Sequence, residues 1–169
     1  MPTEGKLLMY GKDMVGIPPH RRKVNTVFQK YALFPHLNVF DNIAFGLKIK
    51  KLAKKEIELK VNAMLDLVNL SGYGKRYIEQ LSGGQQQRAG LARALSAEPD
   101  VLLMDEPFGA LDALTRLELQ DETRALFNRQ RMTVLMITHD VREAVRMADR
   151  AVVLRGGSAC LLYTSPSPR

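Results

Sequence analysis

Cysteine is nearly absent from the sequence, and long apolar runs are absent altogether. The single cysteine, Cys160, excludes a disulfide framework and a cysteine metal cluster, and it fits a reducing compartment. No apolar run approaches the roughly 20 residues that cross a bilayer, so any membrane role is expected to be peripheral. The N-terminal residues have no long apolar stretch behind a basic start, which argues against a secretory signal.

Acidic residues are outnumbered by basic ones, 18 Asp and Glu against 25 Lys and Arg, and the formal net charge is +7. This excess would suit an acidic partner such as a nucleotide, a nucleic acid or an anionic lipid. Much of it lies in residues 47–60, where lysines are interleaved with apolar residues at helical spacing, so a solvated helix face is the favoured explanation. With 169 residues, 46% of them hydrophobic, the chain is expected to be one globular domain with a small subdomain.

The apolar pattern divides the chain into an α/β core and a helical insert. Residues 1–29 are expected to form short strands and turns of the core. Residues 30–95 have helical periodicity, with helices predicted at 39–49, at 57–70 and from behind Ser82 to near Pro99.

Residues 96–157 return to the core pattern, because short apolar runs alternate with helical stretches. The first two runs, 101–104 and 133–138, are expected to be strands buried on both faces. Helices are predicted at 113–130 and 141–148, and a third strand at 150–154. This alternation predicts one parallel sheet with right-handed crossovers. The last residues, 158–169, have no periodicity and no acidic residue, and we expect a tail that is disordered or not native to the protein.

Titratable side chains follow both buried strands, at the edge where open α/β sheets bind ligands. Asp105 and Glu106 end the first strand, so one can hold Mg²⁺ while the other orients an attacking water. An acidic strand end without function is the alternative for an isolated pair. His139 ends the second strand and could contact a terminal phosphate oxygen and the water, which favours function. Asp112 lies in the loop after Glu106, where capping of the next helix is a sufficient alternative reason for an aspartate.

The stretch LSGGQQQR places a serine and paired glycines at the start of a predicted helix. Ser82 and Gln85 have the spacing of a capping box, which by itself would explain both. Gly83 and Gly84 are poor helix formers, costing about 1 kcal/mol each relative to alanine. They leave backbone N–H groups that a phosphate can approach, and we expect the terminal phosphate of a nucleotide there. Gln29 ends a candidate strand, where a glutamine can ligate Mg²⁺ or position water.

Taken in order, LSGGQQQR, VLLMDEP, ALD and ITHD resemble the signature motif, Walker B strand, D-loop and H-loop of an ATP-binding cassette (ABC) ATPase. The segment 27–47 resembles the Q-loop and following helical subdomain of the same family. The resemblance runs from Gly5 to about Gly156 and implies a P-loop NTPase fold, ATP and Mg²⁺ as ligands, and ATPase activity.

The resemblance also implies a role for each motif residue. Gln29 would sense Mg²⁺ and couple to a membrane subunit, and Asp105 would support Mg²⁺. Glu106 would be the general base, His139 would stabilise the departing γ-phosphate, and Asp112 would bridge a dimer interface. The signature residues, which would contact an ATP held by the opposite subunit, are Ser82, Gly83, Gly84 and Gln85.

The Gly-x-x-x-x-Gly-Lys-Ser/Thr loop of the family does not occur in the sequence. That loop wraps phosphates with backbone N–H groups. We therefore expect a core that is incomplete at its N-terminus and a chain that neither binds ATP tightly nor hydrolyses it alone.

The implied role is the energising subunit of a bacterial importer, at the cytoplasmic face of the plasma membrane. Its partners would be a second ATPase subunit, permease subunits facing Tyr31 to His36, and indirectly a solute-binding protein. The first half resembles ATPases of spermidine/putrescine importers, and the second half resembles those of nitrate, sulfonate or taurine importers, so a chimeric origin stays open. The alternatives are a soluble ABC ATPase, against which the short insert argues, and a basic nucleic-acid binder, which ranks last because few aromatics accompany the lysines.

Overall fold

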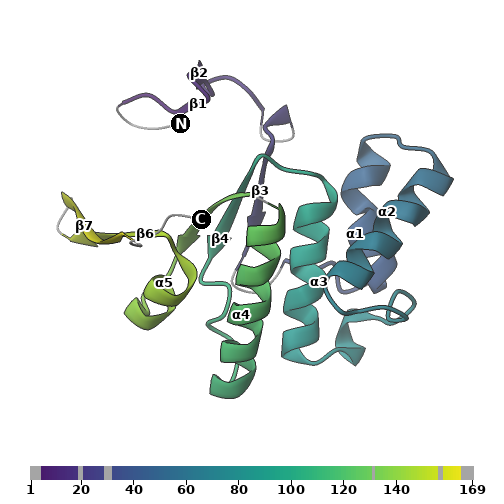
Figure 1. The fold of residues 1–169 in the computed structure, drawn as a ribbon. Helices are drawn as coiled ribbons and strands as arrows, with labels where there is room; N and C mark the ends of the chain where they lie inside the picture. Colours follow the sequence, from purple (N-terminus) through teal and green to yellow (C-terminus); the bar gives the residue numbers. More distant parts are fainter. Residues whose placement is uncertain (1–4, 19–20, 29–31, 131, 156–157, 165–169) are drawn as a thin grey trace.

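A computed structural model describes residues 5–18, 21–28, 32–130, 132–155 and 158–164. Its helical lobe contains α1 (Val39–Ile49), α2 (Lys54–Leu67), the 3₁₀ helix η2 (Ile78–Gln80) and α3 (Gly83–Ser96). The rest of the described chain contains β1 (Leu8–Met9), β2 (Lys12–Asp13), β3 (Val24–Val27), β4 (Val101–Asp105), α4 (Ala113–Gln130), β5 (Thr133–Ile137), α5 (Val141–Met147), β6 (Arg150–Arg155) and β7 (Ser158–Thr164). Figure 1 shows α3 and α4 side by side along the sheet, with α1 and α2 beyond α3.

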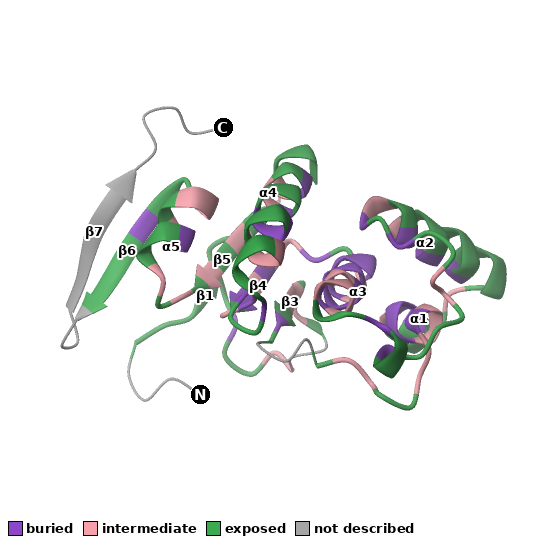
Figure 2. Cartoon of the chain, turned by 90° about the horizontal axis from the view of Figure 1, so that it is seen from below, coloured by how far each residue is buried: buried purple, intermediate pink, exposed green. Residues whose placement is uncertain are grey.

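The helical lobe has its own apolar core, in which α1, α2, η2 and α3 bury their facing side chains (Figure 2). Helix α1 has the predicted bounds because Asn38 caps it, its side chain accepting from Asp41 N at 2.7 Å. Helix α2 differs from the predicted 57–70, starting at Lys54 and ending at Leu67. Its end comes early because Asn69 takes a left-handed conformation, with φ of 56°, that stops the helix.

The predicted parallel sheet is present, and its three strands lie in the order β3-β4-β5. Val27 pairs with Met104 and Asp105 with Ile137, so the carboxyl ends of the strands share one edge. Strand β3 reaches this sheet from the start of the chain, and the whole helical lobe is inserted between β3 and β4. The α/β architecture with a helical insert is therefore confirmed.

One face of the sheet packs on α3 and α4, with Leu102 and Met104 nearly inaccessible between them. The prediction that the run 133–138 is buried on both faces is wrong. Strand β5 is at the edge of the described sheet, and Leu135 and Ile137 on its other face are 59% and 61% exposed. In the described residues no helix covers that face of β5.

Residues 150–154 were predicted to be a third strand of the parallel sheet. This prediction is wrong, because strand β6 does not join that sheet. It pairs antiparallel with β7, with Arg155 opposite Ser158, in a separate two-stranded sheet beyond α5 (Figure 1). A partner close in the sequence therefore satisfies the backbone groups of β6. Residues 158–164 form a strand, so the expectation of a disordered tail is wrong for them, whereas a tail that is not native to the protein stays a prediction; residues 165–169 lie outside the described part.

The N-terminal region of the described chain forms only a short hairpin, in which Leu8 pairs with Asp13 and Met9 with Lys12. Its strands are the ones expected for the first residues. None of the described helices combines the length and the apolar character needed to span a bilayer.

Candidate active site at the carboxyl edge of the sheet

Asp105 and Glu106 lie where β4 stops, at the carboxyl edge of the sheet. Asp105 is the last residue of β4 and is exposed. The backbone N–H of Glu106 donates to Ile137 O at 2.9 Å, which ties the residue to the end of β5. Its φ of 44° is a left-handed conformation that costs a non-glycine residue about 1–3 kcal/mol. The chain therefore holds Glu106 in a strained turn, in which the backbone no longer has the extended conformation of β4.

Glu106 and His139 meet, as the sequence suggests for residues that end neighbouring strands. His139 Nδ1 lies 3.0 Å from Glu106 Oε1. Since a carboxylate oxygen accepts hydrogen bonds, His139 Nδ1–H is the donor in this contact. The His139 side chain is 77% exposed and that of Glu106 is 31% exposed. The pair thus presents a carboxylate and an oriented imidazole to a ligand at one point of the sheet edge.

The turn that carries His139 is fixed by hydrogen bonds on its C-terminal side. Thr138 Oγ1 accepts from Asp140 N at 3.1 Å, and Asp140 Oδ1 accepts from Arg142 N at 2.8 Å and from Glu143 N at 3.3 Å. Asp140 is therefore the N-cap of α5. Because Asp140 directly follows His139 and is anchored as the N-cap, the start of α5 fixes the backbone on which the His139 side chain is carried.

Ser82 and Gln85 form the predicted capping box at the start of α3. Gln85 N donates to Ser82 Oγ at 3.3 Å, and Ser82 N donates to Gln85 Oε1 at 3.0 Å. The amide of Gln85 also donates to Tyr73 Oη at 3.4 Å. The N–H groups of Gly83 and Gly84 have no partner inside the helix, as in any first turn, so they can still receive an anion.

The two glycines of this turn meet different surroundings. A Cβ on Gly83 would lie 3.5 Å from Leu111 Cδ2, an ordinary contact. A Cβ on Gly84 would lie 3.0 Å from Thr115 Cγ2 and 3.2 Å from Leu119 Cδ1. A side chain at position 84 would thus be crowded by α4, a reason for glycine that the sequence does not reveal.

Asp112 occupies the capping position that the sequence suggests, just before α4. Its Oδ1 accepts from Thr115 N at 3.1 Å. These hydrogen bonds from Thr115 hold the pKa of Asp112 below its ordinary value, so the exposed carboxylate stays ionised. Arg116 donates to Leu111 O at 2.8 Å and fixes the residue before Asp112. The start of α3 and the loop of Asp112 are therefore neighbours, because Gly83 faces Leu111.

The fit of these residues to Mg²⁺ and a nucleotide can be judged from their chemistry. The described part of the chain holds no group of three or more His, Cys, Asp or Glu side chains arranged to bind a metal. Mg²⁺ does not need such a cage, because it retains waters and binds through one or two carboxylates together with substrate phosphates. An exposed carboxylate such as Asp105 fits a magnesium ion that arrives with its nucleotide. Gln29, the other expected Mg²⁺ contact, lies outside the described residues.

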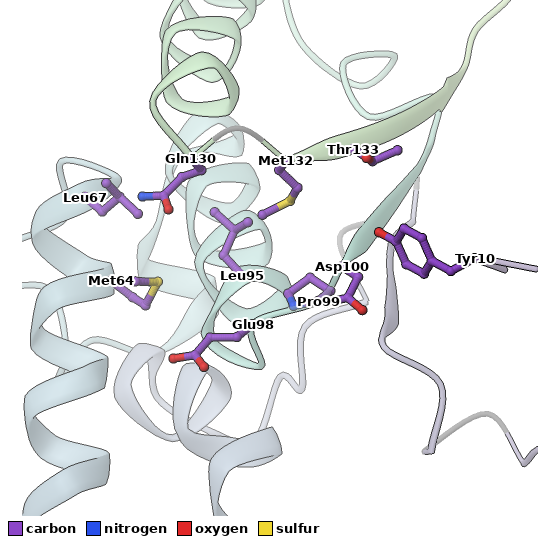
Figure 3. Close-up of a pocket in the computed structure, with 10 residues that line it drawn as sticks. All are labelled: Tyr10, Met64, Leu67, Leu95, Glu98, Pro99, Asp100, Gln130, Met132 and Thr133. Atoms are coloured by element: carbon purple, nitrogen blue, oxygen red, sulfur yellow. The ribbon is translucent and has the colours of Figure 1, made fainter.

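A hollow of about 560 Å³ lies away from these residues. Asp100 and Thr133 line it at the amino ends of β4 and β5, together with Tyr10 and apolar side chains from α2 and α3 (Figure 3). None of the residues expected to be functional lines it. Asp105 and His139 thus lie apart from this hollow and are exposed at the edge of the sheet.

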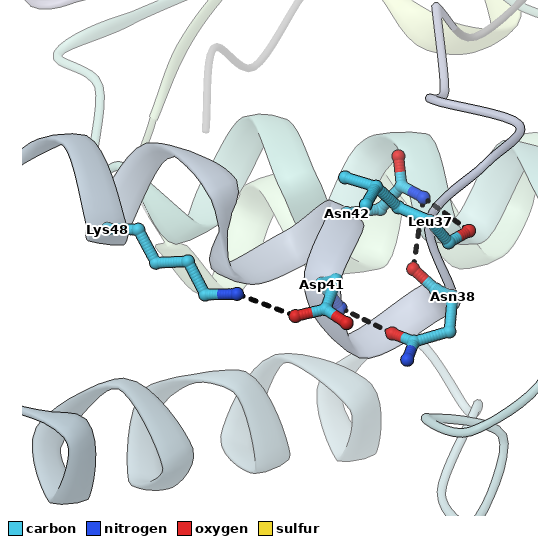
Figure 4. A network of polar contacts seen from close by, with 5 residues as sticks. All are labelled: Leu37, Asn38, Asp41, Asn42 and Lys48. Atoms are coloured by element: carbon cyan, nitrogen blue, oxygen red, sulfur yellow. Dashed lines mark hydrogen bonds and ion pairs between the residues drawn. The ribbon is translucent and has the colours of Figure 1, made fainter.

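Asn42 organises the loop 32–38 and was missed by sequence reasoning. It is fully buried in α1; its Nδ2 donates to Phe34 O at 3.1 Å, Leu37 O at 3.2 Å and Asn38 O at 3.0 Å, and its Oδ1 accepts from Phe34 N at 2.8 Å. Figure 4 shows the contacts to Leu37 and Asn38 beside the exposed pair of Asp41 and Lys48. An asparagine between buried Val39 and Ile43 on the apolar face of a helix is the signal that could have found it.

Comparison with known proteins gives one family and close relatives. The family model described as ABC transporter matches residues 1–109. The chain is 55% identical over 156 residues to a spermidine/putrescine import ATP-binding protein, PotA, of Acetivibrio thermocellus, which is 92% of this chain and 44% of that protein. It is 52% identical over 155 residues to the protein of the same name from Clostridium novyi, with 92% of this chain and 45% of that protein covered. The chain thus spans less than half the length of these curated relatives.

Proposed function

Because the chain belongs to the ABC transporter family, we propose that it is part of the ATP-hydrolysing subunit of a bacterial importer for polyamines of the spermidine/putrescine type. The contact between Glu106 and His139 at the carboxyl edge of the sheet carries the hydrolytic part of this proposal. The names of the relatives support the substrate class, and their alignments of 155 and 156 residues extend over both halves of the chain. Each relative thus aligns with both halves of the chain, which supports a polyamine-type origin also for the half that resembles nitrate, sulfonate or taurine importers.

The hydrolytic chemistry needs a base, an orienting group and a place for the metal. Glu106 orients a water molecule and accepts its proton, with one carboxylate oxygen held by His139 Nδ1–H at 3.0 Å. With Nδ1–H held by Glu106, the Nε2 side of the His139 ring is left for the terminal phosphate, where a proton on Nε2 lets it donate to a phosphate oxygen and stabilise the charge that develops during cleavage. Asp105 supports the Mg²⁺ that accompanies ATP and neutralises phosphate charge when bound.

The signature residues act on the ATP of the opposite subunit in a homodimer. The N–H groups of Gly83 and Gly84 and the hydroxyl of Ser82 face that γ-phosphate at the positive end of α3, and Gln85 keeps Ser82 in place through the capping box. Asp112, ionised and exposed beside them, contacts the partner subunit across the dimer. ATP favours the closed dimer because only that state offers both surfaces, and this differential affinity drives the permeases to change access.

The permease subunits bind at the segment from Tyr31 to His36, next to Gln29; both Gln29 and Tyr31 lie outside the described residues. Phe34 in this segment is tied to α1 by Asn42 and packs against the tilted ring of Phe45, with ring centroids 4.5 Å apart. A solute-binding protein delivers the polyamine to the permeases, and the ATPase subunits lie at the cytoplasmic face of the membrane.

Uptake by the complete transporter in proteoliposomes tests the proposal. With ATP inside, labelled spermidine or putrescine enters, whereas labelled nitrate and taurine do not. Glu106→Gln lowers both uptake and ATP hydrolysis by about 100-fold or more, the range for loss of a general base. Glu118→Gln, an exposed glutamate on α4, is the matched control and retains both. Uptake of nitrate or taurine in place of polyamine would overturn the substrate class, and an active Glu106→Gln protein would overturn the mechanism.

A further inference from the structure

Helix α3 extends from the signature residues to the loop that follows Gln29. Its N-terminus is the capping box of Ser82 and Gln85. Its last turn carries Arg93, whose side chain reaches back 61 positions in the sequence to donate a hydrogen bond to Ala32 O. One rigid helix thus touches both the phosphate-facing turn and the segment 32–36.

The guanidinium of Arg93 is held by two aromatic rings as well as by this hydrogen bond. Its Cζ lies 4.3 Å from the centroid of the Phe34 ring and 5.9 Å from that of Phe45. Phe34 belongs to the loop and Phe45 to α1, and their ring centroids lie 4.5 Å apart with the ring planes tilted by 50°. Burial lowers the pKa of Arg93, yet an arginine remains charged in a protein, so the cation–π contact persists.

Other contacts attach the loop to α1 and attach α1 to the end of α3. Asn42 fixes the backbone of Phe34 to α1. Ser96, one turn after Arg93, donates to Ile43 O at 3.0 Å and joins the end of α3 to α1. Among the side-chain hydrogen bonds and ring contacts of the described loop, those of Arg93 join it directly to α3.

We infer that Arg93 is a positioning residue that transmits displacement of the permease-facing loop 32–36 to the signature end of α3. The inference rests on the proposed function, because it assigns the loop to the permease and the helix to ATP. A planar guanidinium is needed, since only it can lie flat on Phe34 and donate to Ala32 O together. A lysine keeps the charge and a donor but has no flat face.

The experiment uses the complete transporter in proteoliposomes and compares the ATPase subunit alone with the assembled complex. For Arg93→Lys we expect basal hydrolysis within about twofold of wild type, and a loss of permease-stimulated hydrolysis and polyamine uptake of about fivefold or more, the range of a coupling interaction. Phe34→Leu should give the same loss, and the double variant should lose little more, because both changes remove one contact. Arg124→Lys is the matched control: Arg124 also donates to a distant backbone carbonyl, that of Arg146, and should keep wild-type coupling.

The outcomes separate the inference from the proposed function. If basal and stimulated hydrolysis fall by one factor together with the melting temperature, Arg93 is only a structural pin and the inference is wrong. Unchanged coupling in Arg93→Lys overturns it as well, and if that variant does not fold, unchanged coupling in Phe34→Leu does so. A wild-type complex without any stimulation by permease or polyamine contradicts the proposed function instead.

Discussion

Replacement of Gly84 by alanine tests whether the second signature glycine is required by packing. The new Cβ would lie 3.0 Å from Thr115 Cγ2 and 3.2 Å from Leu119 Cδ1. Leu119 is only 2% exposed, and Thr115 is β-branched with few side-chain conformations, so neither can give way freely. Overpacking of this kind costs about 1–3 kcal/mol.

Gly83→Ala is the matched control for this change. Both substitutions gain helix propensity, up to about 1 kcal/mol, so this term largely cancels between them. The Cβ at position 83 meets Leu111 at an ordinary 3.5 Å. We therefore expect Gly84→Ala to be less stable than Gly83→Ala by about 1–3 kcal/mol, which lowers the melting temperature by about 2–4 °C per kcal/mol for a chain of this size.

Thermal unfolding followed by circular dichroism at neutral pH measures the difference. Thr115→Ser removes the nearest atom and keeps the hydroxyl, so the penalty of Gly84→Ala should shrink in that background. Equal melting temperatures of the two alanine variants, or an undiminished penalty with Thr115→Ser, would refute the packing argument.

Three further outcomes follow from the structure. Asn42→Ala leaves the Phe34 N–H without its partner, while Phe34 O keeps Leu37 N at 3.2 Å, and should cost about 1–3 kcal/mol in urea unfolding, where a loss under 1 kcal/mol would contradict the network. The hydrogen bond from Arg146 lowers the pKa of Asp121. The stabilisation that this ion pair provides is therefore present above the unfolded-state pKa of Asp121 and is lost as the pH falls through its folded-state pKa. The difference in stability between wild type and Asp121→Asn should thus persist at neutral pH and close in acid below about pH 4. The 169-residue chain alone should hydrolyse no more ATP than its Glu106→Gln variant in a phosphate-release assay, because its sequence has no phosphate-wrapping loop.

Local signals account for the elements that were predicted correctly. Helix α1 begins behind Asn38, a capping residue, and α4 begins behind Asp112, another one, so both have the predicted bounds. Helix α2 begins behind Ala53, which offers no capping side chain, and its start was placed three residues late. The error at the start of α2 thus occurs where the sequence carries no cap.

Partners distant in space account for the predictions that failed. The apolar run of β5 has the composition of a buried strand, but exposure of Leu135 depends on what covers the sheet, which no local pattern encodes. For β6 a local signal was present and overlooked. The dipeptide between β6 and β7 in the sequence is Gly-Gly, which favours two-residue hairpin connections, and it would have predicted the pairing of Arg155 with Ser158.

In the candidate site, too, local sequence signals predict some features, whereas others depend on elements that are distant in the sequence. Strand ends and cap spacing were enough to predict the neighbourhood of Glu106 and His139 and the capping box of Ser82, whereas the role of Gly84 required the position of α4. The loop after Glu106 is anchored by Phe108, fully buried in the core that α3 and α4 share. A well-packed core transmits displacement because it contains little free volume. We therefore expect movement of α3 to displace the loop of Glu106 in the same chain, although in the proposed dimer the start of α3 binds the ATP of the opposite subunit. The two nucleotide sites of such a dimer are thus expected to be coupled through each subunit's own core.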